Sequence, residues 1–434
     1  MSSAPLDEAE LRGIVRSAEQ AGASGRREEA RRLLSQAQAI APDHPLVLNA
    51  AGVEELRKGD ALAARRLLER AVEQDDKNPS FWINLATAFR GLNLPDEESK
   101  ALDRVFALDP RHLLALLQKG SLLERQGKRK AAATSFQKAL QTLPPGTKLP
   151  ETLRSAIQRA VDAVRENKAA LAAFLDERLR EVRTQHASAS QERFDHCIAS
   201  LLGKRKIFTP QPNFLHFPKI ATWEYYPREG FPWLAELESA TADIRGEFER
   251  VFAEDADSLE PYIAYPEGVP IDQWAELNHS RRWSAFYLWR DGAPVEEHLA
   301  RCPKTAAALR RLPLADLPGY APTAFFSILD ARTHIPAHNG VTNTRLIVHL
   351  PLVIPGACRF RVGSDTRAWR VGQAWVFDDT IEHEAWNDSD VPRAILILDI
   401  WHPDLSEAER DLVRAAVPGI RDFYRDDAPI TASG

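Results

Sequence analysis

A 34-residue repeat in the first third of the chain constrains the fold more than any other feature. Sixteen positions fall in register at this interval, namely Ile14, Leu48, Trp82 and Leu116; Ala18, Gly52, Ala86 and Gly120; Gly25, Gly59, Asn93 and Gly127; and Ala37, Ala71, Val105 and Ala139. Small residues in the second set allow two antiparallel helices to approach closely, and Gly or Asn in the third set turns the chain between them. Self-similarity at this period predicts stacked helical pairs.

This pattern resembles the tetratricopeptide repeat, in four copies over about residues 10–143. The resemblance implies an all-α solenoid whose concave face suits an extended peptide or a partner protein. The third copy departs from the pattern, because Glu98 replaces a small residue and Pro95 falls early in the second helix. Nothing in the repeats is catalytic, so we expect this region to bind a partner.

Composition and charge narrow the class of protein further. The 434 residues carry a net charge of −6 and form no polycation, so we expect no nucleic-acid partner. The three cysteines are far apart in sequence, which favours a reducing compartment. The first 18 residues lack the apolar core of a signal peptide, and no run of about 18 apolar residues occurs. We therefore expect a cytoplasmic protein without a membrane span.

The sequence pattern changes after the repeats. Pro144, Pro145 and Gly146 end the array, residues 150–203 show helical spacing and form a predicted helical linker, and Pro and aromatic residues become frequent near Phe208. We predict one helix over 235–255 and a closing helix over 404–417. Between these helices we predict strands, with no helices separating them, over residues 283–289, 323–329, 345–353, 358–362, 374–377 and 393–400. Such spacing favours an antiparallel sandwich or barrel, for which a jelly roll is one architecture.

Histidine and arginine gather in the predicted strands. Because side chains alternate along a strand, Arg345 and His349 share one face with Ile347. His338 precedes this strand, and His383 follows the strand over 374–377. We expect a hairpin to bring Arg393 back beside the strand that carries His383.

This combination points to a particular chemistry. Two neutral imidazoles with open coordination positions suit a redox-active iron. The forked donors of arginine match a carboxylate in bidentate fashion, so a pair of arginines suits a dicarboxylate. Together these groups predict a 2-oxoglutarate pocket beside Fe(II).

Residues 323–404 resemble the aspartyl/asparaginyl β-hydroxylase family of Fe(II)/2-oxoglutarate oxygenases. The matching strings are PAHNGVTNTRLIVHL, FDDTIEHEAW and LDIWHP, and weaker similarity extends over about 208–420. The resemblance implies that residues 208–434 form a double-stranded β-helix, a jelly-roll or cupin-like oxygenase domain. A repeat array ahead of the oxygenase also matches larger members of the family.

The resemblance also implies a role for each site residue. His338 and His383 match the metal-binding histidines, and Gly340 stands where most related oxygenases carry a ligating acid. Ser327 and Arg393 match residues that hold the distal carboxylate of 2-oxoglutarate. The set is completed by Arg345 and His349, near the chelating end of 2-oxoglutarate or the substrate, and by Asp379, an acid beside the metal ligands.

The expected activity is hydroxylation of an unactivated C–H bond with Fe(II), 2-oxoglutarate and O2. Family preference points to the β-carbon of Asp or Asn in a protein or peptide that contacts the repeats. Two alternatives remain: a lipid acyl chain or small peptide product as substrate, and a non-catalytic adaptor with a decayed jelly roll. Animal members of the family carry a cysteine pair near the string PKT, and this chain has only Cys302 there. This departure argues against a disulfide-bearing growth-factor module as substrate.

Overall fold

The structure is a computed structural model that describes residues 8–144, 146–254 and 258–424. The chain divides into two compact units, Met1–Gln191 and Glu192–Gly434. Each unit has hydrophobic clusters of its own and is described by itself. Within the described residues, no helix combines the length and the apolar character needed to cross a membrane.

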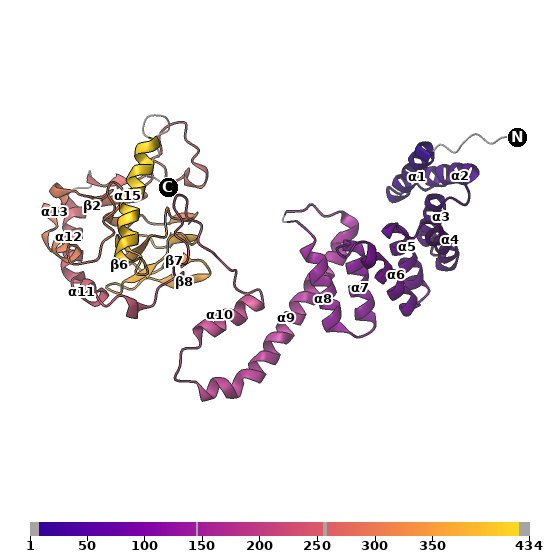
Figure 1. The fold of residues 1–434 in the computed structure, drawn as a ribbon, viewed down its shortest axis with the longest axis horizontal. Helices are drawn as coiled ribbons and strands as arrows, with labels where there is room; N and C mark the ends of the chain where they lie inside the picture. The colour runs from indigo at the N-terminus through magenta and orange to yellow at the C-terminus, as the bar shows by residue number, and fades with distance from the viewer. Residues whose placement is uncertain (1–7, 145, 255–257, 425–434) are drawn as a thin grey trace. The chain divides into compact units, whose positions relative to one another are not determined.

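Eight helices in antiparallel pairs form most of the first unit (Figure 1). Their bounds are α1 Glu8–Ala23, α2 Arg27–Ile40, α3 Pro45–Lys58, α4 Ala61–Gln74, α5 Pro79–Gly91, α6 Pro95–Leu108, α7 Leu113–Arg125 and α8 Arg129–Gln141. The turn inside each pair holds Gly25, Gly59, Asn93 or Gly127, all with φ between 56° and 86°. Only Gly and, less readily, Asn adopt this left-handed conformation at low cost, so the third set of repeat positions is explained. The predicted helical solenoid is confirmed.

The small residues of the repeat mark the closest helix contacts. A Cβ atom added to Gly52 would lie 2.6 Å from the Leu68 side chain, and one added to Gly120 would lie 2.3 Å from Phe136. Pro95 does not interrupt a helix, because it occupies the first turn of α6, where a missing N–H costs nothing.

Two further helices follow the repeats. Helix α9 (Glu151–Gln185) buries Ile157 and Ala160 in a cluster with Phe136 and Ala139 of α8, so its first turns cover the end of the array. Helix α10 (Glu192–Leu201) belongs to the second unit. The predicted linker over 150–203 is therefore helical in both of its parts.

Two antiparallel sheets form the centre of the second unit. The larger runs in the order β1-β2-β4-β11-β6-β9 with β3 beside β2, and the smaller runs β5-β10-β7-β8. The bounds are β1 Glu260–Pro261, β2 Trp283–Arg290, β3 Ala293–Pro294, β4 Ala324–Leu329, β5 Thr333–His338, β6 Arg345–Val353, β7 Cys358–Val362, β8 Asp365–Ala368, β9 Trp375–Phe377, β10 His383–Asn387 and β11 Arg393–Trp401. From β4 onward the chain crosses to the other sheet after every strand except β7, which is followed by its neighbour β8 in the smaller sheet. This strand order is that of a jelly roll. Ile347 and Ile395 of the larger sheet share one apolar cluster with Ile335 and Phe360 of the smaller, so the sheets pack face to face.

Helices cover the outer face of the larger sheet, where Phe248 of α12 (Thr241–Glu254) contacts Phe326 of β4.

The prediction of a single helix over 235–255 is wrong in the described residues. Two helices occupy this segment, α11 (Leu234–Ser239) and α12, separated at Ala240. Two short helices, α13 (Glu296–Arg301) and α14 (Pro303–Leu309), also separate β3 from β4, although none was predicted between the strands. The closing helix α15 is longer than predicted and spans Glu407–Tyr424.

The predicted hairpin between the strands of His383 and Arg393 is also wrong. Strand β10, which begins at His383, pairs with β5 and β7, whereas β11, which begins at Arg393, pairs with β4 and β6. The connection crosses from one sheet to the other. Arg393 therefore approaches the site from the sheet opposite His383.

Candidate active site

His338 and His383 lie side by side on the smaller sheet. His338 is the last residue of β5 and His383 is the first of β10, and the two are direct partners across the antiparallel pair. Side chains at paired positions project from the same face of a sheet. Their ring centroids are 4.0 Å apart.

Backbone carbonyl groups orient both rings in the same way. Nδ1 of His338 lies 2.7 Å from the Pro336 carbonyl oxygen, and Nδ1 of His383 lies 3.0 Å from that of Ile381. Because a carbonyl oxygen only accepts, each Nδ1 donates, and the lone pair of each neutral ring is on Nε2. Burial lowers the pKa of His338 well below its usual range and that of His383 to about 4. Two neutral imidazoles of fixed tautomer could hold a metal ion.

Across the cavity, the larger sheet contributes a buried cation. Arg393 is 1% exposed, and Ser327 supplies its hydrogen bonds, from Nη1 to the carbonyl and hydroxyl oxygens, both at 3.4 Å. Its Nε atom is buried and has no partner among the described residues, and its guanidinium lies 4.8 Å from the centre of the Trp369 ring. Burial lowers the pKa of Arg393 to about 10. A buried guanidinium with no carboxylate to bind is costly unless an anion satisfies it, so this end of the cavity could hold a carboxylate.

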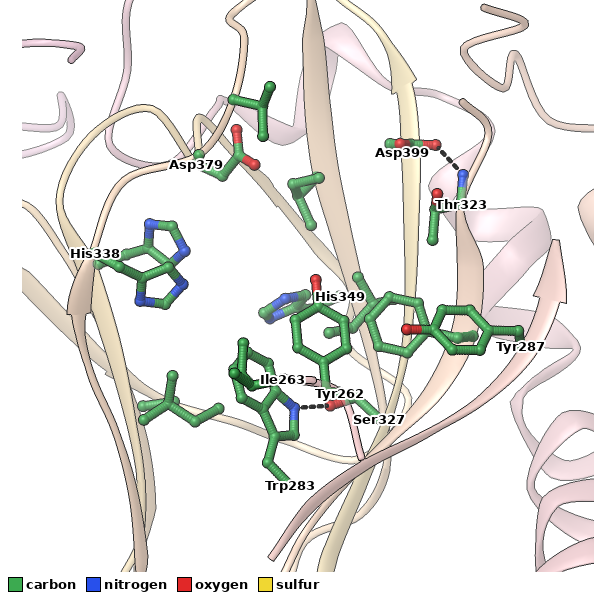
Figure 2. Close-up of a pocket in the computed structure, with 18 of the residues that line it drawn as sticks. Tyr262, Ile263, Trp283, Tyr287, Thr323, Ser327, His338, His349, Asp379 and Asp399 are labelled. Atoms are coloured by element: carbon green, nitrogen blue, oxygen red, sulfur yellow. Dashed lines mark hydrogen bonds between the residues drawn. The ribbon is translucent and has the colours of Figure 1, made fainter. Parts of the chain in front are cut away.

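Ser327 and His349 complete this side of the cavity. Trp283 donates from Nε1 to the Ser327 hydroxyl oxygen at 3.1 Å (Figure 2). This bond holds the hydroxyl that also accepts from Arg393. His349 points into the cavity from β6, and its Nδ1 is buried without a partner. Burial and the nearby Arg393 charge hold the pKa of His349 well below its usual range. His349 therefore presents a neutral, unpaired ring nitrogen near the candidate anion site.

Asp379 occupies the space that a side chain at position 340 would need. A Cβ atom on Gly340 would lie 2.2 Å from the Asp379 carboxylate, and the Gly340 N–H donates to the Asp379 carbonyl oxygen at 2.6 Å. One carboxylate oxygen, Oδ1, is buried without a hydrogen bond. Burial raises the pKa of Asp379, and the nearby Arg345 charge opposes the rise.

Arg345 is less available to a ligand than its sequence position indicated. It lies between two buried acids, 3.5 Å from Asp379 and 3.2 Å from Asp399. Burial raises the pKa of Asp399 to about 6, and Arg345 opposes this rise. Through this ion pair, Arg345 helps to hold the Asp379 carboxylate in place.

All seven predicted site residues line one cavity of about 550 Å³ between the sheets. A volume of this size is typical of small-molecule sites, which range over roughly 300–1,000 Å³. The sequence analysis missed Tyr262, which stacks on Trp283 at 4.1 Å, and Trp274, whose ring lies edge-on to His338 at 4.9 Å. Both come from the irregular segment before β2, where no periodicity marks a side chain as inward-facing. Tyr287 and Asp399 also line the cavity. Because they lie on the strands β2 and β11, the alternation of side chains along a strand could have identified them.

In the part of the chain that the structure describes, no group of three or more His, Cys, Asp and Glu side chains could hold a metal ion. The pair of imidazoles thus stands without a ligating acid in its immediate group. Two neutral imidazoles on one sheet and a buried guanidinium on the other thus face one cavity, which could hold a metal ion beside a small anion.

Comparisons with known proteins show which family this part of the chain resembles. Residues 238–403 match the model of the family described as "Aspartyl/Asparaginyl beta-hydroxylase". The mouse aspartyl/asparaginyl beta-hydroxylase is 32% identical over 200 residues, which cover 45% of this chain and 27% of the relative. The ornithine lipid ester-linked acyl 2-hydroxylase of Rhizobium tropici is 33% identical over 197 residues, covering 45% of this chain and 66% of the relative.

Residues 238–403, which lie within the second unit, are therefore similar to the aspartyl/asparaginyl β-hydroxylase family, and the predicted resemblance is confirmed. The match spans about a quarter of the length of the mouse relative. The helical part is similar to the solved structure of a thermophilic TPR protein of Thermus thermophilus, with a TM-score of 0.31 and 21% identity, over 41% of this chain and 97% of that one. Because this TM-score is low, the repeats are assigned from the helix bounds and turn residues of this chain and not from that structure.

Proposed function

We propose that the protein is an Fe(II)- and 2-oxoglutarate-dependent dioxygenase that hydroxylates an unactivated C–H bond. The observation that carries the proposal is the pairing, in one cavity, of two neutral imidazoles with a buried guanidinium for which the described residues supply no carboxylate partner. The first suits a divalent iron and the second suits the far carboxylate of a dicarboxylic acid.

The residues divide the work between the two sheets. His338 and His383 would hold the iron through Nε2, with their Nδ1 donors fixed by backbone carbonyls. Arg393 and the Ser327 hydroxyl would bind the distal carboxylate, and the free Nδ1 of His349 would contact the cosubstrate from β6. Asp379 would accept a hydrogen bond beside the metal ligands through its unpaired oxygen. When bound, the iron and 2-oxoglutarate supply the oxidative chemistry with O2, and succinate and CO2 are the coproducts.

For the substrate, we propose the β-carbon of an Asp or Asn residue in a protein or peptide. The name of the mouse relative and the family match over 238–403 support this choice. The helical solenoid supports a polypeptide, because stacked repeats present an extended surface that a small-molecule enzyme needs less. We propose no nucleic-acid partner and a reducing, cytoplasmic setting, which the unpaired state of Cys197, Cys302 and Cys358 supports.

A lipid acyl chain is the second candidate substrate. The Rhizobium tropici relative, named for acyl 2-hydroxylation of an ornithine lipid, matches this chain at 33% identity over 66% of its own length. A small peptide product is a further form of the same alternative. A non-catalytic adaptor is disfavoured, because all seven predicted site residues line one cavity.

Two measurements test these assignments. Purified protein with Fe(II), ascorbate and 2-oxoglutarate should release succinate, and omission of iron should abolish the release. Incubation with a cell lysate, followed by mass spectrometry for a gain of one oxygen, should identify hydroxylated Asp or Asn peptides. Hydroxylated lipid in place of peptide would establish the second candidate, and wild-type protein that neither binds 2-oxoglutarate nor forms succinate would reject both.

A further inference from the structure

Asn387, a residue outside the cavity lining, connects the two backbone segments that carry the candidate anion site. It is the last residue of β10 and is fully buried. Its Nδ2 group donates to the carbonyl oxygens of Leu329 at 3.0 Å, Asp330 at 2.9 Å and Val391 at 2.9 Å. Leu329 is the last residue of β4 and Asp330 follows it, whereas Val391 precedes β11 by two residues.

These carbonyl groups lie two or three residues from the side chains that matter. Leu329 follows Ser327 by two residues on β4, and Val391 precedes Arg393 by two residues. Leu329 and Arg393 are also direct partners between β4 and β11. A single side chain on the smaller sheet thus fixes the ends of two strands of the larger one.

The other half of the Asn387 amide is equally occupied. Its Oδ1 accepts from the Ser389 N–H at 3.1 Å, the Ser389 hydroxyl at 2.6 Å and the Cys358 thiol at 3.3 Å. An asparagine side chain carries donors and an acceptor on neighbouring atoms, so it serves carbonyl and hydroxyl groups at once. Aspartate keeps the acceptor and loses the donors, and alanine loses both.

Arg393 has few other restraints. Ser327 supplies its hydrogen bonds at 3.4 Å, and its remaining contact of note is the Trp369 ring. The position of the guanidinium therefore depends on the backbone that precedes it. We propose that Asn387 is a positioning residue that sets the separation and orientation of Ser327 and Arg393 and thereby the affinity for the dicarboxylate. This inference rests on the proposed binding of 2-oxoglutarate.

The test compares Asn387→Ala and Asn387→Asp with Glu247→Gln in the full chain. Glu247 is a matched control because it is also buried and also clamps backbone: its carboxylate accepts from the N–H groups of Lys304 and Thr305, on α14 and outside the cavity. The dissociation constant of 2-oxoglutarate is measured by calorimetry on protein loaded with Mn(II), and succinate release is measured with iron. Deuterium uptake over 327–332 and 388–394 is measured without cosubstrate.

For both Asn387 variants we expect the dissociation constant and the Michaelis constant for 2-oxoglutarate to rise by about tenfold, because small misplacement of a binding group is enough for such a loss. The turnover number at saturation should fall less than about threefold. Deuterium uptake should rise in both named segments, and in Glu247→Gln it should rise near 303–306 with 2-oxoglutarate affinity unchanged.

Unchanged uptake over 388–394 in Asn387→Ala, or equal losses of affinity in Asn387→Ala and Glu247→Gln, would overturn the positioning role. Wild-type protein that binds 2-oxoglutarate but forms no succinate would reject the hydroxylase proposal and leave the affinity comparison intact. If the wild-type protein does not bind 2-oxoglutarate, the proposed function fails, and the uptake data alone decide whether Asn387 orders the two segments.

Discussion

The two sheets of the second unit supply one cavity with polar groups that differ in charge and in hydrogen bonding. The smaller sheet provides His338 and His383, whose rings are neutral and fully specified by hydrogen bonds to backbone carbonyl groups. The larger sheet provides Arg393, whose charge is buried and whose Nε has no partner. The N–H donor of each imidazole therefore has an acceptor in the protein, whereas one donor of the guanidinium has none among the described residues.

This difference shows where stability and function compete. An oriented neutral imidazole costs little to bury, because its hydrogen bond offsets its desolvation. A guanidinium without a counter-ion destabilises the fold until an anion arrives. We therefore expect substitutions on the smaller sheet to remove metal binding with modest effects on stability, and substitutions of the buried cation to remove anion binding while stabilising the free protein.

The largest effect is expected for His383→Ala. Loss of one of two metal ligands should lower the affinity for Mn(II) by at least about 100-fold and reduce succinate release to background. His334→Ala is the control, since His334 is on the same sheet but is exposed and stacks on the half-buried Trp386. The affinity of each variant for Mn(II) is measured by calorimetric titration. Wild-type affinity in His383→Ala would contradict the assignment of the smaller sheet as the metal side.

The second effect is expected for Arg393→Met, which keeps much of the volume and removes the charge. The dissociation constant of 2-oxoglutarate should rise by about 100-fold, because a buried charge-assisted contact is lost. The free energy of unfolding without ligand should rise by about 1 kcal/mol or more, because an unpaired buried charge is removed. Urea unfolding and calorimetry on the same preparation measure both changes. A variant with a lower free energy of unfolding and an unchanged affinity for 2-oxoglutarate would contradict the assignment of Arg393 as an unpaired cation that binds the anion.

Much of this contrast could be predicted from the sequence, and the reasons are specific. The alternation in Arg345–Val353 placed Arg345, Ile347 and His349 on one face, and all three line the cavity. Strands β6 and β7 begin and end where apolar patterning predicted them. The repeats were predictable because Gly at the turns and small residues at the helix contacts each have one steric reason.

Other parts were not predictable from local pattern. Strands β5 and β10 were not delimited, because His338, His383 and Glu384 interrupt the alternation of apolar residues that marks a strand. The ten residues from His383 to Arg393 fit a hairpin in length, yet in a jelly roll they cross to the other sheet. The pairing of Arg345 with Asp379 and Asp399 depends on side chains brought together from three separate elements, so no spacing in the sequence reports it.

A smaller effect is expected for Gly340→Ala. A methyl group at this position would overlap the Asp379 carboxylate and displace it from its place beside the metal ligands. We expect succinate release to fall about tenfold, a loss typical of a misplaced group near the chemistry. In an Asp379→Ala background the same change should have little further effect, because the overlap is gone. Additive losses in the double variant would show that Gly340 acts independently of Asp379.

The smallest effect concerns pH and the imidazole on the larger sheet. Burial lowers the pKa of His349 in the folded protein, so between its folded and unfolded pKa values the unfolded chain binds more protons. Stability due to His349 is therefore lost as pH falls below about 6.5. Asp399, whose pKa burial raises to about 6, acts in the opposite direction, so the total slope is shallow. The difference between the wild-type protein and His349→Gln isolates the imidazole. In urea unfolding without ligand, the wild-type protein should lose up to about 2 kcal/mol relative to the variant between pH 6.5 and 5. A difference that stays constant across this range would mean that His349 binds protons as readily in the folded protein as in the unfolded chain, which would contradict the effect of burial on its pKa.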